Sequence, residues 1–258
     1  MRKIIGIILL DLFALLPFVP GMATESQQWE ELFFEANQAY KEGRFQEAVD
    51  AYGQLIKSGH SNGHLFYNMG NSYFRLDELG RAILNYERAR LLMPRDADLN
   101  FNLNYARDQT RDVVSESDGF VSTTFFWLDS LSLHELLWSF VVLNVLFWAI
   151  VIARLFSASD GIYYVFVVIL VSWLVAGASF GLKWYHVGAD DRAVILNKEV
   201  KILAGPDIQD TALFKLHTGT IVHRERSEDG WSLIRLSDKK RGWVRSEAIE
   251  RIIRIGRV

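Results

Sequence analysis

The chain has 258 residues, a formal net charge of −3 and no cysteine. The absence of cysteine excludes disulfide bonds, thiolate nucleophiles, cysteine-ligated zinc sites and a lipidated N-terminal cysteine. Acidic residues outnumber basic ones by 16 to 10 between residues 24 and 119, and basic residues lead by 15 to 11 from residue 183 onward. Neither excess forms a run of Lys or Arg, so we expect no binding to nucleic acid.

The first 23 residues have the pattern of a signal peptide. Arg2 and Lys3 precede an apolar stretch that extends to Val19, and the small residues Gly21 and Ala23 occupy the positions that a signal peptidase reads. We therefore predict that this segment is a signal peptide, with an uncleaved membrane anchor as the alternative. Either segment would export the domain that follows it.

Residues 24–117 contain an internal repeat with a period of 34 residues. The matching pairs are Ala36 with Gly70, Asn37 with Asn71, Tyr40 with Phe74, Ala48 with Ala82, and Tyr52 with Tyr86. This period resembles that of the tetratricopeptide repeat, which folds as a pair of antiparallel helices. We therefore predict an all-α solenoid with helices over residues 29–42, 45–57, 63–76 and 79–92, and a fifth helix that begins near Ala97.

The resemblance to tetratricopeptide repeats implies a concave binding surface, which the first helix of each repeat lines. The residues that we expect there are Phe33, Asn37, Tyr40, Asn68, Asn71, Phe74, Phe101 and Tyr105. The asparagines resemble part of the clamp with which some such domains hold the C-terminal carboxylate of a peptide. The lysines of that clamp are missing, so the alternative is that the asparagines satisfy local backbone groups. A groove of this kind suits a partner protein better than a small substrate.

The centre of the chain contains two long apolar segments. Residues 118–135 read as a linker that ends in an interfacial aromatic segment, and residues 136–156 and 162–182 each have about the 20 apolar residues that cross a bilayer. Only five residues separate the two apolar segments, so we predict a transmembrane helical hairpin with both flanking domains on one side of the membrane. The alternative is a buried helical pair in a soluble protein.

The last segment, residues 189–258, changes to short strands separated by turn residues. We predict strands at 200–202, 213–216, 220–225, 231–236 and 242–245, which is the pattern of a small all-β barrel. Gly205-Pro206, Gly219-Thr220, Asp229-Gly230-Trp231 and Arg241-Gly242-Trp243-Val244 resemble a bacterial SH3-type domain. We expect Trp231 and Trp243 to anchor its core, with ligand binding by these aromatic rings as the alternative.

The sequence shows no catalytic constellation. No Gly-rich phosphate loop follows a predicted strand, and no nucleophile elbow is present. His60 and His64 lie close together in the sequence, but no third metal ligand accompanies them. We therefore predict that the chain is not an enzyme and has no catalytic residue, cofactor or metal site.

The order of these segments resembles the E-type proteins of the bacterial aerotolerance (Bat) operons. This resemblance implies a multi-pass protein of the bacterial inner (cytoplasmic) membrane with both soluble domains in the periplasm or another extracytoplasmic space. It also implies von Willebrand factor A-type membrane proteins as partners, an indirect link to a MoxR-type ATPase, and a role in envelope stress or aerotolerance. We therefore predict a membrane-anchored scaffold. The alternative is a cell-wall tether whose SH3-type domain binds peptidoglycan or its peptides.

Overall fold

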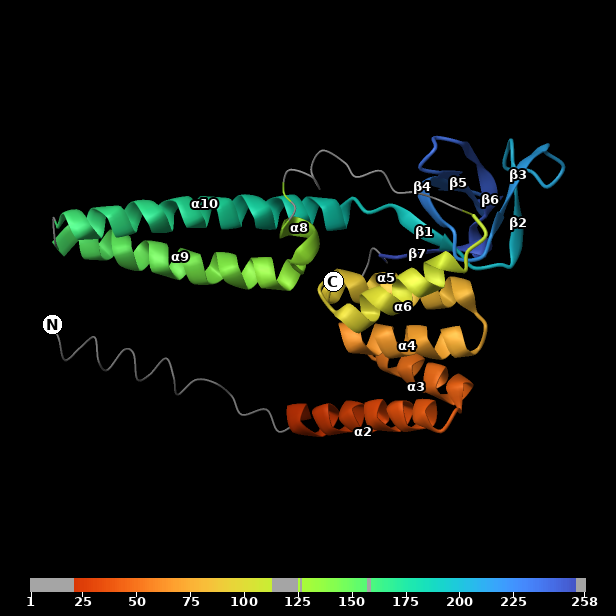
Figure 1. Cartoon of the computed structure of the whole chain (residues 1–258), viewed down its shortest axis with the longest axis horizontal. Helices are drawn as coiled ribbons and strands as arrows, with labels where there is room; N and C mark the ends of the chain where they lie inside the picture. Colours follow the sequence, from red (N-terminus) through yellow and green to blue (C-terminus); the bar gives the residue numbers. More distant parts are fainter. Residues whose placement is uncertain (1–20, 113–124, 126, 157–158, 254–258) are drawn as a thin grey trace.

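The computed structural model describes residues 21–112, 125, 127–156 and 159–253. In these residues the chain forms a helical domain, a long helical hairpin and a C-terminal antiparallel sheet (Figure 1). The predicted signal peptide falls almost entirely on residues 1–20, which lie outside the described part. Residues 118–124 and 126 of the predicted linker lie outside it as well, whereas 125 and 127–135 are described.

The helical domain consists of two antiparallel helix pairs and a single last helix. Its elements are α2 (Gly21–Lys41), α3 (Phe45–Lys57), α4 (Gly63–Arg75), α5 (Leu79–Leu92) and α6 (Ala97–Asp108). The last four helices agree with the predicted ranges to within one residue where a range was predicted, whereas α2 begins eight residues earlier than expected. We call α2 to α6 the helical stack, because successive helices lie on one another (Figure 1). Its identification with tetratricopeptide repeats stays a prediction.

Local signals fix where these helices begin and how closely they pack. The Asn62 side chain accepts a hydrogen bond from Leu65 N at 2.8 Å and so caps α4. Between α4 and α5, a Cβ atom on Gly70 would lie 2.7 Å from the ring of Tyr86. Gly70 therefore allows the close approach of the two helices, and the buried Tyr86 ring fills the space that a side chain would otherwise occupy.

The hairpin consists of α9 (Leu133–Phe156) and α10 (Asp160–Gly188), which lie side by side (Figure 1). Both helices are longer than the predicted segments: α9 begins three residues earlier, and α10 extends by two residues at the turn and by six at its other end. At the start of α9, Glu135 N donates to Ser132 Oγ at 3.2 Å and Ser132 N donates to Glu135 Oε2 at 2.8 Å. This reciprocal pair is a capping box.

A short helix, α8 (Trp127–Ser130), packs across the base of the hairpin. Trp127 Nε1 donates a hydrogen bond to Ser179 Oγ at 3.1 Å, and Lys183 Nζ donates to the Leu128 carbonyl at 2.6 Å. The described end of the predicted linker is therefore folded against α10.

The C-terminal sheet has seven strands in the order β3-β2-β6-β5-β4-β1-β7, all antiparallel to their neighbours. The strands are β1 (Arg192–Ile195), β2 (Glu199–Leu203), β3 (Ala212–His217), β4 (Ile221–Glu228), β5 (Trp231–Arg235), β6 (Arg241–Arg245) and β7 (Ile249–Arg251), with a 3-10 turn, η1 (Ser246–Ala248), before the last. Five strands were predicted. The two additional strands, β1 and β7, pair with each other, and β1 also pairs with β4.

Candidate functional site

The asparagines of the first helix pair are tied into the helical stack. Asn37 Oδ1 accepts hydrogen bonds from Tyr52 OH at 2.7 Å and from Asn68 Nδ2 at 2.8 Å. Burial raises the pKa of Tyr52, so its hydroxyl stays protonated and remains a donor. The carbonyl oxygen of Asn37 therefore joins α2 to α3 and α4 and is not available to a ligand.

The same arrangement recurs one period later. Asn71 Oδ1 accepts hydrogen bonds from Tyr86 OH at 2.7 Å and from Asn102 Nδ2 at 2.9 Å. The Tyr67 hydroxyl also interacts with the side chain of Asn71. Asn68 contributes through its Nδ2, which donates to Asn37. The three predicted site asparagines are thus tied into the helical stack by their side chains.

Three of the predicted aromatic residues come together on α4 and α6. The ring of Tyr105 lies 5.8 Å from that of Phe74 and 6.4 Å from that of Phe101, with the latter pair nearly parallel. Phe101 is 70% exposed and Tyr105 is 54% exposed. We call these three residues the aromatic patch. Exposed rings held against one another are typical of surfaces that bind protein partners.

The other predicted aromatic residues do not join this patch. Phe33 packs 6.1 Å from Tyr52, and Tyr40 packs 5.5 Å from Phe45, both within the first helix pair. The structure therefore divides the predicted concave surface into a structural part on α2 and an exposed part on α4 and α6.

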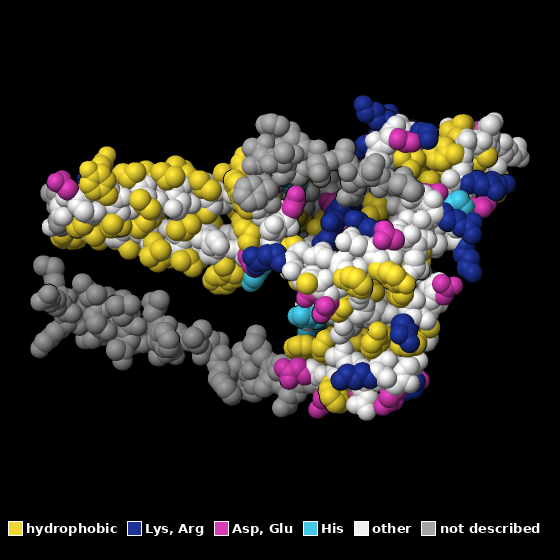
Figure 2. All heavy atoms as spheres, in the orientation of Figure 1, with side chains coloured by type: hydrophobic (Ala, Val, Ile, Leu, Met, Phe, Trp, Pro, Cys, Tyr) yellow, Lys and Arg dark blue, Asp and Glu magenta, His cyan; other side chains and the backbone are white. Residues whose placement is uncertain are grey.

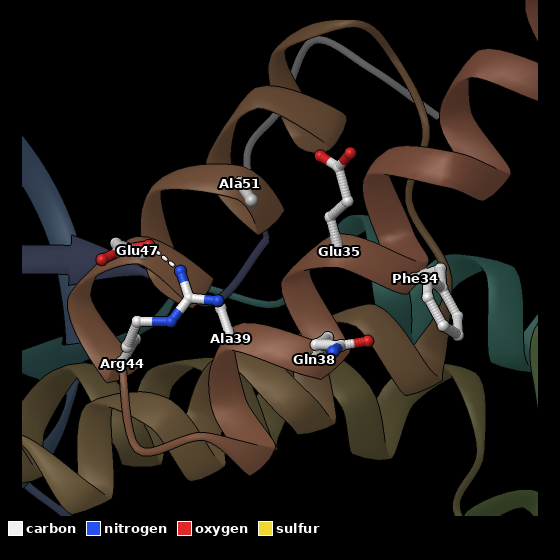
Figure 3. Close-up of a pocket in the computed structure, with 7 residues that line it drawn as sticks. All are labelled: Phe34, Glu35, Gln38, Ala39, Arg44, Glu47 and Ala51. Atoms are coloured by element: carbon white, nitrogen blue, oxygen red, sulfur yellow. Dashed lines mark hydrogen bonds and ion pairs between the residues drawn. The ribbon is translucent and has the colours of Figure 1, made fainter.

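One pocket of about 370 Å³ opens between α2 and α3 (Figure 3) and was not predicted. Its lining consists of Phe34, Glu35, Gln38, Ala39, Arg44, Glu47 and Ala51. The Arg44 guanidinium already pairs with Glu47 inside the pocket and with Glu42 at its edge. Arg44 is thus neutralised by its neighbours, and Glu35 adds a further carboxylate to the lining.

Trp231 and Trp243 are buried, each 6% exposed, but they lie outside the main core of the sheet. Along β5, Ile234 belongs to the main core, so Trp231 and Leu233 project from the opposite side of the strand. Together with Leu203 on β2, the two tryptophans and Leu233 form a separate outer cluster. Both rings are therefore buried in a second core cluster, on the side of β5 and β6 that faces away from the main core.

Two arginines that the sequence reasoning missed cover these rings. The Arg245 guanidinium lies 4.3 Å from the centre of the Trp231 ring, and that of Arg226 lies 5.0 Å from the centre of the Trp243 ring. Arg226 also lies 3.6 Å from Glu228, whereas Arg245 forms no ion pair with any described residue. The spacing of Trp243 and Arg245, two residues apart on β6, was the sequence signal for this arrangement. We call Trp231, Trp243, Arg226 and Arg245 the basic tryptophan face.

The sheet domain packs directly on the helical stack (Figure 1). We call this contact, which α5 and α6 make with β1 and with the residues around β7, the joint. At its centre Glu87 is fully buried and pairs with Arg90 at 2.8 Å, with Arg107, and with Arg192 of β1 at 3.6 Å. Burial alone would raise the pKa of Glu87, but the three guanidinium groups outweigh it and lower the pKa. Glu87 therefore remains an ionised carboxylate inside the joint.

A second carboxylate connects the end of the helical stack to the sheet. Asp112 accepts hydrogen bonds from Thr220 Oγ1 at 2.7 Å and from His217 N at 2.6 Å, and His217 Nδ1 lies 3.0 Å from Asp112 Oδ1. Burial raises the pKa of Asp112, but these hydrogen bonds outweigh it and the pKa is lowered. Nothing in the local sequence predicted this contact, because its partners are 105 residues apart.

On the other side of the joint, Arg88 binds the strand that ends the sheet. Its Nε donates to the Ile252 carbonyl at 3.0 Å, and its Nη2 lies 2.8 Å from Glu250 Oε1. Val194 and Ile252 are buried in the same apolar cluster as Ile83. The joint therefore combines apolar burial with paired charges, as a stable interface does.

Comparison with known families covers the sheet domain alone. Residues 197–250 match the family of the bacterial SH3 domain, which includes β2 through β6 and the first residues of β7 but leaves β1 outside. No curated protein matches the chain. The prediction of a bacterial SH3-type domain is thus confirmed for these residues, and the C-terminal part of the chain is similar to bacterial SH3 domains.

Proposed function

We propose that the chain is a membrane-anchored scaffold that assembles envelope proteins on the extracytoplasmic side of a bacterial inner membrane. The observation that carries this proposal is the joint, which holds the aromatic patch and the basic tryptophan face on one body at the base of the hairpin. The resemblance to E-type aerotolerance proteins supports von Willebrand factor A-type proteins as its partners, in a role linked to envelope stress.

The membrane anchor is supported by the surface of the hairpin. Each of its helices is long and apolar enough to cross a membrane, yet only 6% of each apolar segment is buried. A buried core helix of a soluble protein would have most of this surface covered. Figure 2 shows hydrophobic side chains over the hairpin and charged ones on the other two domains. Both domains lie at the same end of the hairpin, away from its turn, which supports their placement on one side of the membrane (Figure 1).

The aromatic patch is the surface that we propose for the partner protein. We expect the double substitution Phe101→Ala and Tyr105→Ala to reduce recovery of the partner about tenfold, because exposed aromatic anchors carry much of the binding free energy of an interface. The measurement is the yield of co-purified von Willebrand factor A-type protein from detergent-solubilised membranes. Asn71→Ala is not a suitable test, since it would release Tyr86 and Asn102 inside the stack.

Phe34→Ala is the matched control for this experiment. Phe34 is 67% exposed, similar to Phe101, but it lines the pocket between α2 and α3 instead of the aromatic patch. We expect its substitution to leave partner recovery unchanged. Equal recovery with the patch variant and with the control would reject the patch as the binding site.

A cell-wall tether is the second candidate function, and the basic tryptophan face favours it. Bacterial SH3 domains often bind peptidoglycan, whose peptides carry carboxylates. Arg245 lies over an aromatic ring and has no acidic partner among the described residues. Its guanidinium can therefore donate hydrogen bonds to a carboxylate of the ligand without first breaking an ion pair. Arg226 is 63% exposed and presents a second cation on the same face.

The tether predicts that the full-length protein in detergent sediments with purified peptidoglycan. We expect the double substitution Arg226→Gln and Arg245→Gln to lower the sedimented fraction about tenfold, by removing two charge-assisted hydrogen bonds. The control is Lys201→Gln with Lys215→Gln, which removes the same charge from cross-strand neighbours on β2 and β3. If both pairs of substitutions reduced the sedimented fraction equally, the binding would be a nonspecific charge attraction, and the basic tryptophan face would be rejected as the peptidoglycan site.

A further inference from the structure

The helical stack ends without a further helix in the described part of the chain, and the sheet domain covers that end. α5 belongs to the second helix pair, and α6 follows it without a partner helix of its own. The face that a following helix would cover is instead packed by β1 and by the residues after β7, with Val194 and Ile252 buried against α5 and α6. Repeat stacks require such a terminal element, because an uncovered last face would expose apolar side chains to water.

Glycines on both sides of the joint allow the two domains to approach closely. A Cβ atom on Gly80, in the first turn of α5, would lie 2.5 Å from the Ile195 carbonyl oxygen and 2.6 Å from Thr218 Oγ1. Gly80 N also donates a hydrogen bond to Thr218 Oγ1 at 3.1 Å. From the sheet side, a Cβ atom on Gly219 would lie 2.7 Å from Ile83 Cδ1. Each domain thus places a glycine where the other domain lies closest.

Charged groups at the end of the helical stack form hydrogen bonds to the sheet domain. Asp112 accepts from both a backbone N–H and a hydroxyl of the strand region that contains His217 and Thr220. Arg88 binds backbone carbonyl groups of Arg251 and Ile252. Detaching the sheet domain would therefore leave polar groups on both domains without these partners, in addition to exposing the apolar cluster.

We propose that the bacterial SH3-type domain is the C-terminal cap of the helical stack, so that the two domains open and close as one cooperative unit. Flexible tethering of two independently folded domains would not need a buried carboxylate, two glycines at close contacts and a shared apolar cluster. A consequence is that a ligand bound to the basic tryptophan face stabilises the end of the helical stack that carries the aromatic patch.

The test is hydrogen exchange of the full-length protein in detergent, with Gly80→Ala as the first variant. In an isolated helix, alanine in place of glycine slows amide exchange about fivefold because it raises helix stability. In the capped structure the new methyl group strikes Ile195 and Thr218, so we expect exchange in α5, α6, β1 and β7 to speed up together by about tenfold. Gly53→Ala is the control, since no atom lies within 4 Å of a Cβ at that position in α3. We expect Gly53→Ala to slow exchange in its own helix only.

Slower exchange around Gly80→Ala, or faster exchange confined to one domain, would overturn the proposal. If that variant fails to fold, Glu87→Gln decides, because it keeps the side-chain shape and removes only the charge in the joint. Its control is Glu78→Gln, which removes an exposed carboxylate at the start of the same helix. We expect Glu87→Gln to speed up exchange in both domains at least tenfold more than Glu78→Gln, and equal effects of the two variants would reject the cap.

Discussion

Glu87 is the residue on which the joint depends most. A carboxylate that is fully buried is stable only when its charge is neutralised and its oxygens accept hydrogen bonds. Three arginines from α5, α6 and β1 fulfil both conditions around Glu87. No sequence pattern singles out this residue, since a glutamate followed by arginines on a helix usually indicates a solvated face.

We expect Glu87→Ala to lower the free energy of unfolding by about 3–5 kcal/mol, because Arg90 and Arg107 would remain close together without their shared counter-charge. Urea unfolding of the full-length protein in detergent, followed by tryptophan fluorescence, measures this change. Glu78→Ala should cost less than about 1 kcal/mol, as expected for an exposed ion pair. Similar losses in both variants would show that the buried network contributes little.

For Trp231 and Trp243, the sequence predicted burial but not the side of the sheet on which the rings lie. Their burial was expected from their size and from the turn residues before them, and both are buried. Their side of the sheet could not be settled from residue type alone. It depends on the register of β4, β5 and β6, which pairs Trp231 with Arg245 and Leu233 with Trp243.

At the scale of elements, β1 and β7 escaped prediction for a related reason. β1 reads Arg-Ala-Val-Ile and is buried at three successive positions, so it shows no alternation, and the three residues of β7 directly follow a 3-10 turn. Each becomes a strand because the other pairs with it and because α5 covers both. By contrast, α3, α4 and α5 were predicted closely, since turn residues and apolar periodicity mark such helices locally.

The contact between α5 and β1 should weaken in acid. The pKa values of Glu87 and Asp112 are lowered in the folded protein, so their stabilising contribution is present at neutral pH. This contribution begins to fall as pH drops below the ordinary values of 4.5 and 3.8 and is lost when the folded pKa values are passed. We therefore expect the unfolding midpoint to decrease below about pH 4.5, with faster hydrogen exchange in α5 and β1.

Glu87→Gln with Asp112→Asn is the control for this acid dependence. Without the two carboxylates, the unfolding midpoint should be lower at pH 7 than that of the unmodified protein. It should also change less between pH 5 and pH 3, because carboxyl groups with ordinary pKa values of about 4 titrate in this range. An identical pH profile for both proteins would assign the acid sensitivity to other groups.

At the scale of the whole molecule, the hairpin determines where the two domains can act. Its turn lies at one end, and the helical stack and the sheet domain lie at the other (Figure 1). Arg95 of the helical stack pairs with Glu135 at the start of α9, so the stack contacts the base of the hairpin directly. With the proposed membrane anchor, this arrangement would hold both domains close to the membrane surface.

The absence of native cysteine makes this topology directly measurable. We expect Lys240→Cys and Glu47→Cys to react with a membrane-impermeant maleimide in spheroplasts, whereas Asp160→Cys, at the start of α10, should react only after lysis. The reason is that a double crossing returns the chain to the side from which it entered. The unmodified protein is the control and should not react. Labelling of Lys240→Cys and Glu47→Cys on opposite sides would contradict a shared compartment.

The sequence by itself determined the classes of element and their order: a helical region of period 34, two apolar helices and a strand-rich region similar to bacterial SH3 domains. These features can be predicted because turn residues, apolar periodicity and the length of apolar segments depend on residues only a few positions apart. Only the tertiary structure decided that Asn37 and Asn71 connect helices of the stack, that the tryptophans form a second buried cluster, and that Glu87 pairs with Arg192. Those outcomes depend on contacts between distant segments, such as Arg88 with Ile252 at a separation of 164 residues, which no local pattern encodes.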